Sequence, residues 1–281
     1  MSSKISQKVK IRLFLAFAII CWAVVACWAM YSQQQGSAVD PIYPTLHGDI
    51  YSNAENFQSS SSDLSSLYSG GINTLLVANP QDAPKATGEA LSLLALHRRS
   101  DPVILICFQD GIGSVPLYGD EHWQTAYGVT NVNRDFLKYF DQMGAVSDNE
   151  TLNRCNDLGA LMTYFSYSMP GITVAPLVFD TATDLSMIES TMQKLRQIAK
   201  ESSIVVMLPQ GASEAELCSD NVDDLERYFG DENSDFSAVL GSAATVALTA
   251  FHSLSDEETE IYLWSEEKPQ KLSDLLIVSG E

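Results

Sequence analysis

Histidine and cysteine are scarce in this chain, and neither occurs at a spacing typical of a metal site. The four histidines, His47, His97, His122 and His252, are far apart, and no two cysteines form a Cys-x-x-Cys pair. Zinc, iron and copper sites in proteins are usually built from several such side chains. The sequence therefore argues against a metal centre rich in histidine or cysteine.

Lysine and arginine are absent from residue 13 to residue 84. Within this gap, Leu13 to Tyr31 is an apolar run without a charge, close to the ~20 residues that a bilayer-spanning helix needs. Four basic residues precede it, so the positive-inside rule places the N-terminus in the cytoplasm. We predict a cytoplasmic stub at 1–12, a single-pass transmembrane anchor at 13–31, a flexible linker at 32–44 and an extracytoplasmic domain at 45–281.

Two alternatives to an anchor remain open for this apolar run. It is also compatible with a cleaved signal peptide, or with a lipoprotein signal in which Val24-Val25-Ala26 precedes a lipidated Cys27. Trp28 directly after the cysteine, and apolar residues up to Met30, favour an uncleaved anchor. All three readings export the domain.

The exported part is strongly acidic. All 36 acidic residues but only 12 of the 16 basic ones lie beyond residue 30, which gives this part a formal charge of −24. Such a charge repels nucleic acid and anionic lipid headgroups, so neither is expected as a partner. A protein partner or a small ligand remains compatible with it.

Beyond the linker, short apolar runs alternate with longer helical patterns. This alternation predicts a mostly parallel central sheet with helices on both faces, an α/β fold in one domain. The expected strands are 74–78, 103–108, 173–179 and 204–208, with further strands at 260–264 and 275–279. The expected helices are 84–97, 134–143, 182–200 and 234–253.

Several segments carry a resemblance to a known family. They are Gly48-Asp49-Ile50-Tyr51, Trp123-Gln124-Thr125-Ala126-Tyr127-Gly128 with the run that continues to Leu137, and Val174-Ala175-Pro176-Leu177. In this order they resemble the Gly-x-Phe-Tyr-Pro, Trp-x-Thr-Pro-Leu-Gly and Val-Pro-Ile-Leu segments of the Memo family, also called AmmeMemoRadiSam system protein B. That family is similar in fold to class III extradiol dioxygenases, so the resemblance implies this fold for roughly residues 45–280.

The chain departs from the family where the resemblance implies metal ligands. The family's loop histidines correspond to Gln81 and Asp110, and its Glu-His-Ser turn lies near Asn156-Asp157-Leu158. Its Ser-Asp-x-x-His loop corresponds to Pro209-Gln210-Gly211-Ala212-Ser213, and a late cysteine to Leu240. Amide and hydroxyl groups are poor ligands for iron, copper or zinc. We therefore expect no cofactor, and a remnant cleft lined by Asn79, Gln81, Asp82, Gln109, Asp110, His122, Trp123, Gln210 and Ser213.

Two carboxylates offer a different metal chemistry. We expect Asp82 and Asp110 to lie at the ends of adjacent strands, where oxygen ligands could hold Ca²⁺ or Mg²⁺. The competing interpretation is structural, with Asp82 capping the following helix and Asp110 closing a glycine-containing turn.

Other candidates for catalysis are weak. His122 is the one histidine near the cleft loops in sequence, and a single loop histidine is more often structural than catalytic. Ser213 and Ser114 lie outside any Gly-x-Ser-x-Gly motif, and Gly111-Ile112-Gly113 is only a fragment of a nucleotide-binding loop.

These observations lead to a ranked set of functions. The first is a membrane-anchored, extracytoplasmic Memo-like pseudoenzyme that binds a ligand or a protein partner. The alternative is an enzyme of the same fold with a relocated or carboxylate-based metal site. The third is a structural component of the cell envelope.

Overall fold

A computed structural model describes residue 68 and residues 70–213, 242–255, 260–264, 271–274 and 276–280. All of them belong to the unit formed by Pro41–Glu281. The predicted anchor at 13–31, the linker at 32–44 and Leu240 lie outside the described residues. Within the described part of the chain, no helix is both long and apolar enough to cross a membrane.

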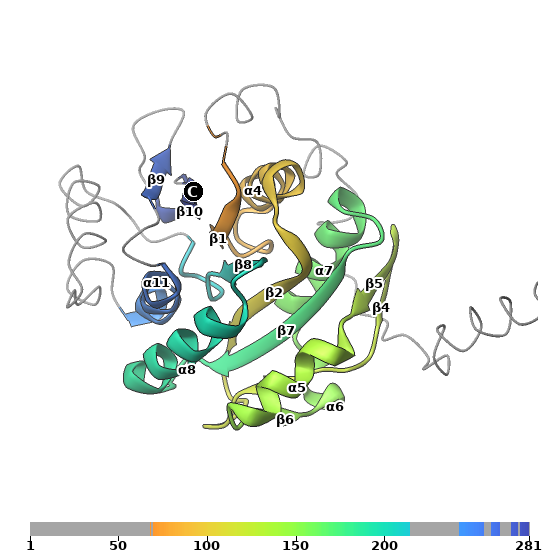
Figure 1. The fold of residues 1–281 in the computed structure, drawn as a ribbon, viewed down its shortest axis with the longest axis vertical. Helices are drawn as coiled ribbons and strands as arrows, with labels where there is room; N and C mark the ends of the chain where they lie inside the picture. Colours follow the sequence, from red (N-terminus) through yellow and green to blue (C-terminus); the bar gives the residue numbers. More distant parts are fainter. Residues whose placement is uncertain are drawn as a thin grey trace, which may run out of the picture. The chain divides into compact units, whose positions relative to one another are not determined.

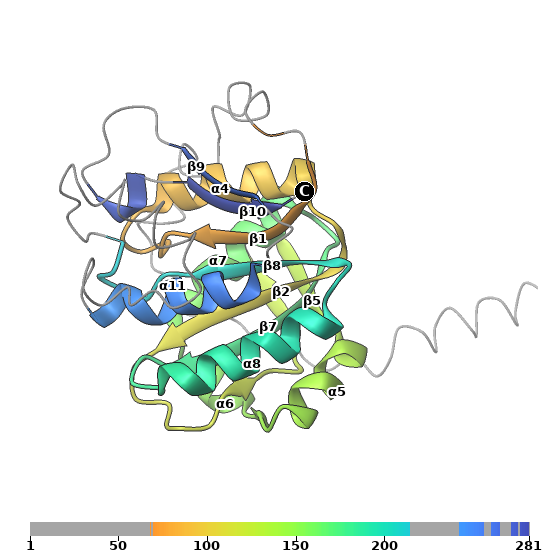
Figure 2. The ribbon, with the colours of Figure 1, turned by 60° about the vertical axis from the view of Figure 1, so that its left-hand side comes forward.

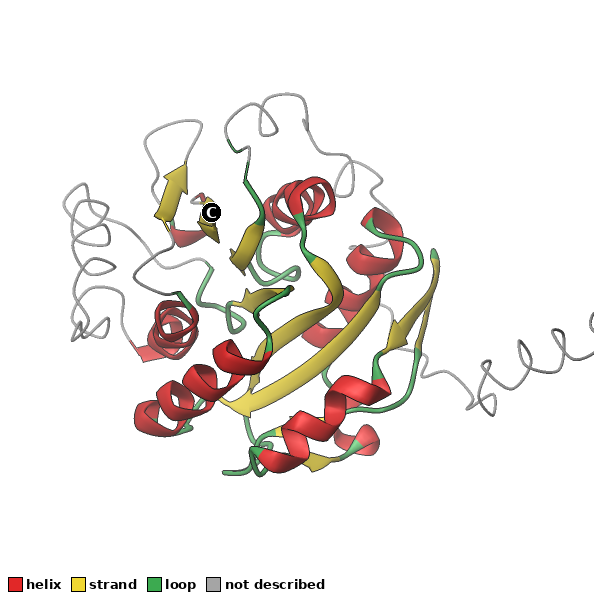
Figure 3. Ribbon diagram, in the orientation of Figure 1, coloured by secondary structure: helices red, strands yellow, loops and turns green. Residues whose placement is uncertain are grey.

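The described residues form one mixed sheet with helices packed against it (Figures 1 and 3). The elements are β1 (Ile72–Val77), α4 (Pro84–His97), β2 (Ser100–Gln109), β3 (Leu117–Tyr118), β4 (Trp123–Thr125), β5 (Gly128–Val132), α5 (Arg134–Gln142), β6 (Val146–Ser147), α6 (Asn149–Leu152), α7 (Asn156–Ser168), β7 (Thr173–Asp180), α8 (Leu185–Ile198), β8 (Ser202–Met207), α11 (Ser242–Leu254), β9 (Glu260–Trp264), a 3₁₀ turn at Leu272–Asp274, and β10 (Leu276–Gly280).

The sheet is parallel in its centre and antiparallel towards its ends. Its strand order is β4-β5-β7-β2-β8-β1-β10-β9, with β3 and β6 attached beside β7. The four pairs from β5 to β1 are parallel, whereas β4 with β5, β1 with β10 and β10 with β9 are antiparallel. The prediction of an α/β fold is confirmed, and the sheet is mixed: the local runs that predict strands contain no information about the direction of the edge strands.

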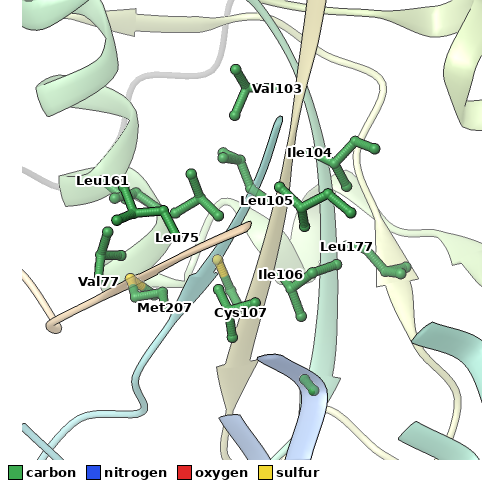
Figure 4. Close-up of a cluster of buried hydrophobic side chains, with 14 of the residues drawn as sticks. Leu75, Val77, Val103, Ile104, Leu105, Ile106, Cys107, Leu161, Leu177 and Met207 are labelled. Carbon is green, nitrogen blue, oxygen red and sulfur yellow. The ribbon is translucent and has the colours of Figure 1, made fainter. Parts of the chain in front are cut away.

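Helices cover both faces of the sheet. α8 packs against α11 on one face, and α4 packs against α7 on the other; Figure 2 shows α8 and α11 in front of the strands and α7 behind them. Along β2, Ile104 and Ile106 point to the α8 side with Leu177, while Leu105 and Cys107 point to the side of α7 (Figure 4). The central strands are therefore buried on both faces, which is why they are apolar without alternation.

Several boundaries follow directly from local chemistry. α4 begins at Pro84, whose fixed φ suits the first helical turn, and the predicted range 84–97 is confirmed. The Asn133 side chain accepts from the Phe136 N–H and starts α5, and Asp184 caps α8 through the Ser186 N–H. That cap explains why α8 starts at 185 and not at the predicted 182. The strand predicted at 260–264 is confirmed, while residues 234–241 of the last predicted helix lie outside the described part.

The largest element absent from the sequence prediction is α7. Ten consecutive residues of this helix, 157–166, are buried. A helix that is buried on all sides shows no apolar stripe, so its sequence lacks the 3.6-residue period by which helices are recognised.

Pro176 lies in the interior of β7, where a missing N–H normally breaks a ladder. The Val174 carbonyl accepts from the Asn133 N–H and so faces β5, and Pro176, two residues on, faces the same side. On that side the pairing with β5 ends at Val174 and the pairing with β3 begins at Leu177. The proline therefore occupies the gap between two partner strands, where no N–H is required.

Candidate functional site

The candidate site lies at the carboxyl edge of the parallel strands. Because β1, β8, β2 and β7 run in the same direction, the loops after them meet at one edge of the sheet. The N-terminus of α7 reaches the same edge. Asn79, Gln81 and Ser213 are brought together here, as the loop positions predicted, and Asp157 joins them.

Asp157 is the centre of a hydrogen-bonded network. Asn79 Nδ2 donates to Asp157 Oδ2 at 2.9 Å, and Gln81 Nε2 donates to Asp157 Oδ1 at 2.5 Å. Asn79 is fully buried and Asp157 is 6% exposed. The carboxylate lies in the first turn of α7, where the helix dipole favours a negative charge. Two amides and a helix terminus thus hold one buried carboxylate.

Asn79 also connects this carboxylate to the loops. Its side-chain oxygen accepts from the Gln81 N–H at 2.9 Å, and its own N–H donates to Ser213 Oγ at 2.8 Å. Nδ2 lies 3.4 Å from the Leu208 carbonyl oxygen. Asn79 therefore fixes the loop after β1 to the loop after β8 as well as to α7.

Asp82 makes a second link between the same two loops. Its Oδ2 accepts from the Gly211 N–H at 2.7 Å. Gly211 has φ of +81°, a conformation that side chains with a Cβ rarely adopt, and this turns its N–H towards the carboxylate. Gln210, beside it, is exposed.

The loops after β2 and β7 form a separate linked pair. Thr181 donates from its hydroxyl to Asp110, and the Gly113 N–H donates to Asp180 Oδ2 at 3.0 Å. Burial raises the pKa of Asp180, but N–H groups of Ala182 and of residues 111–113 outweigh it, so the pKa lies below its usual value. Gln109, the last residue of β2, is half-buried and pairs with Asp180 at the end of β7.

The expectation that Asp82 and Asp110 follow adjacent strands is wrong. β8 lies between β1 and β2, so the two carboxylates belong to different loop pairs and bind different groups. The physical reason is the crossover after β7, which places β8 in the middle of the sheet. Among the described residues, no three histidine, cysteine or acidic side chains are arranged to hold a metal ion.

His122 and Trp123 lie away from these loops, at the β4–β5 hairpin. β5 pairs with the first residues of β7, Thr173 and Val174, whereas the candidate site adjoins the end of β7 at Asp180. Trp123 is buried opposite Thr130, and the Thr130 hydroxyl donates to the Met162 carbonyl of α7. The expectation that His122 and Trp123 line the cleft is therefore wrong, because the hairpin pairs with the start of β7 and the cleft loops follow the strand ends.

Two buried thiols next to Asp157 were not among the predicted site residues. Burial raises the pKa of Cys107 well above its usual value, and the nearby Cys155 and Asp157 raise it further. Burial and then Asp157 raise the pKa of Cys155 to about 11. Both thiols are therefore neutral at physiological pH and act as small apolar groups. In the sequence, Asp157 was marked only by the resemblance of the segment near Asn156-Asp157-Leu158 to a Glu-His-Ser turn of the Memo family.

The network defines what this site can do chemically. The two oxygens of Asp157 accept from two amides, and Asn79 Oδ1 accepts from a backbone N–H. A metal cation bound to these oxygens would have to displace those donors, so the residues present are a poor fit for a metal centre. In this network the polar side chains of Asn79, Gln81 and Asp157 stabilise one another.

Comparison with known proteins gives one positive result. No model of a known protein family matches the chain. No curated protein matches it either. Among solved structures, the fold is similar to that of the uncharacterized protein JW3007 from Escherichia coli K12, with a TM-score of 0.54 and 11% identity, over 75% of this chain and 100% of that one. This likeness shows the fold alone.

Proposed function

We propose that this protein is a Memo-like binding module whose site lies at the carboxyl edge of the sheet and does not use a redox metal. The observation that carries the proposal is the pair of hydrogen bonds from Asn79 and Gln81 to the buried carboxylate of Asp157. The resemblance aligns Gln81 with a histidine ligand and Asp157 with the metal-binding turn. Side chains that satisfy each other at these positions support loss of the metal chemistry.

The position of the site supports recognition of a partner. Gln210 and Gly211 are exposed beside the buried network, and Gln109 is half-buried at the end of β2. Ligands of open α/β sheets bind at this edge. Because each loop is tied to its neighbour by side-chain hydrogen bonds, the edge is preorganised, which lowers the entropic cost of binding.

A metal measurement tests the first half of the proposal. The full chain, purified in mild detergent without chelators, is expected to carry well below one transition-metal ion per chain by elemental analysis. Titration with Zn²⁺ or Fe²⁺ is expected to leave its thermal unfolding unchanged. Stoichiometric metal that disappears in Asp157→Asn would overturn the proposal, because it would show a working metal site at this carboxylate.

A crosslinking experiment tests the second half. A photoreactive amino acid replaces Gln210 at the carboxyl edge or, as a control, Glu201 at the opposite end of β8; both positions are exposed. After irradiation in the native cells, a discrete adduct is expected from position 210 and not from position 201. Equal labelling of both positions would contradict recognition at the carboxyl edge.

We also propose that the module is held on the outer side of a membrane by residues 13–31. The support is the uncharged apolar run with basic residues only before it. The full chain is expected to stay in the membrane fraction after alkaline carbonate extraction, and external protease is expected to reach the domain in spheroplasts or intact cells. Release by carbonate would contradict the anchor.

A further inference from the structure

At the open end of the β4–β5 hairpin, a histidine side chain takes the place of a strand as hydrogen-bond partner of a β5 backbone N–H. The Asn133 N–H points to β7, where it donates to the Val174 carbonyl. The neighbouring N–H of Val132 therefore points the other way, towards the side of β4. The first residue of β4, Trp123, pairs with Thr130 of β5, so no residue of β4 lies opposite Val132. His122 Nδ1 accepts the Val132 N–H at 3.0 Å.

This hydrogen bond requires a neutral imidazole. With Nδ1 as the acceptor, the proton of the ring must lie on Nε2, and a doubly protonated ring has no acceptor. Val132 is only 5% exposed, so water cannot easily replace the lost partner of its N–H. A buried N–H without a partner destabilises the state that contains it. Protonation of His122 thus opposes the geometry in which the hairpin is closed.

The charges around the imidazole act in the same direction. Burial lowers the pKa of His122, Arg134 at the start of α5 lowers it further, and Asp120 in the preceding loop partly opposes them. Asp120 is itself engaged: its Oδ1 accepts from Asn149 Nδ2 at 2.6 Å, and its carbonyl accepts from Arg134 Nε at 3.0 Å. Glu121 is the remaining charged neighbour in sequence.

β4 has little else to hold it. It is a three-residue edge strand whose only partner among the described strands is β5. Its large contact with the rest of the domain is Trp123, which is 1% exposed. Within the described part, the buried indole N–H of Trp123 has no hydrogen-bond partner, so this contact adds packing but no directional bond.

We propose that His122 is an acid-sensitive clamp on the β4–β5 hairpin: uptake of a proton by its imidazole removes the acceptor for the Val132 N–H and frees the start of β4 from the sheet. Release of β4 uncovers Trp123 and the part of α7 beneath the hairpin. The clamp contributes its full stability above the ordinary histidine pKa of about 6.5. That contribution is lost as the pH falls through the lower pKa of the folded state.

Amide exchange and histidine titration of the full chain in detergent test the clamp together. Imidazole ¹⁵N shifts are expected to show His122 with the proton on Nε2 and a midpoint below that of a free histidine. The protection factor of the Val132 amide is expected to fall as the pH drops below about 6.5, by roughly tenfold for each unit by which the folded pKa is lowered.

Two variants separate the clamp from general acid destabilisation. In His122→Asn the side-chain oxygen can accept the Val132 N–H but does not titrate, so the fall in protection should disappear. In His252→Asn the fall should persist, because His252 is another histidine whose pKa is lowered by burial but lies on α11. A Val132 amide with no pH dependence in the wild type, or with the same dependence in His122→Asn, would overturn the proposal. The wild-type titration decides the question even if His122→Asn does not fold.

Discussion

Asp157→Asn removes the charge at the centre of the candidate site with almost no change in shape. The carboxylate offers an acceptor to Asn79 and another to Gln81. An asparagine side chain offers one oxygen and one NH₂ group, so one of the two donors faces another donor. The variant therefore tests the network without creating a cavity.

The expected cost follows from the number of bonds lost. A hydrogen bond to a charged group contributes about 1.5–3 kcal/mol, and a buried donor left unpaired costs about 1–3 kcal/mol. Gln81 is only half-buried, so water can partly replace its partner, whereas Asn79 is fully buried. We expect the free energy of unfolding to fall by about 2–4 kcal/mol, with a melting temperature lower by roughly 5–15 °C.

Urea unfolding of the full chain in mild detergent, followed by circular dichroism, measures this change. The slope of the unfolding free energy with urea should stay constant while the midpoint falls. Asp135→Asn is the matched control, because the same chemical change there affects an exposed carboxylate, paired with Lys138, in the first turn of another helix, α5. That control should unfold at the wild-type midpoint.

A second variant reverses the polarity of the bond. In Gln81→Glu with Asp157→Asn, the new amide can accept from Asn79 and donate to the new carboxylate, so stability should rise above that of Asp157→Asn alone. If the free energy of unfolding of Asp157→Asn differs from that of the wild type by less than about 0.5 kcal/mol, the usual range of a neutral surface change, the hydrogen bonds to Asp157 do not stabilise the fold as proposed. A double variant no more stable than the single one would refute the assigned donor–acceptor geometry.

Three further outcomes follow from the same edge of the sheet. Asn79→Asp places two carboxylates in contact, which raises the pKa of one of them. The variant should therefore be least stable above neutral pH and regain stability as the pH falls, whereas Asn79→Ala should show no such recovery. Urea unfolding of both variants at several pH values measures the difference. Gly211→Ala should cost about 1–2 kcal/mol in the same assay because its φ is positive, and an unchanged midpoint would contradict the observed turn. Cys107 and Cys155 should resist alkylation at pH 8 in the native protein and react after unfolding, as peptide mass mapping would show; rapid native labelling would contradict their raised pKa values.

The parallel centre of the sheet could be predicted because its strands are continuous apolar runs with turn residues after them. The same reasoning placed Asn79, Gln81 and Ser213 at one edge, since loops after parallel strands share an edge. Asp82 and Asp110 were placed too close together, because strand order depends on the crossovers and not on any local pattern.

Other features were beyond a local reading for specific reasons. α7 is buried on every side and so lacks a helical period, and the helix that begins beside Asp157 was therefore not predicted. The hydrogen bond from Val132 to His122 forms because the Val132 N–H points away from β7. The register of β5 on β7 sets this direction. Such a contact needs the three-dimensional register, although His122 itself was singled out in the sequence.

The insertion of β8 between β1 and β2 has a consequence for synthesis of the chain. β1 and β2 pair with β8 and not with each other. In a nascent chain that has not reached residue 202, the edges of β1 and β2 that face β8 therefore have no partner strand. The bonds from Asn79 to Ser213 and from Asp82 to Gly211 close only afterwards, across 134 and 129 residues. The domain should therefore fold late during synthesis, with long-range contacts that slow folding. Substitutions in this network should mainly accelerate unfolding and leave the folding rate almost unchanged.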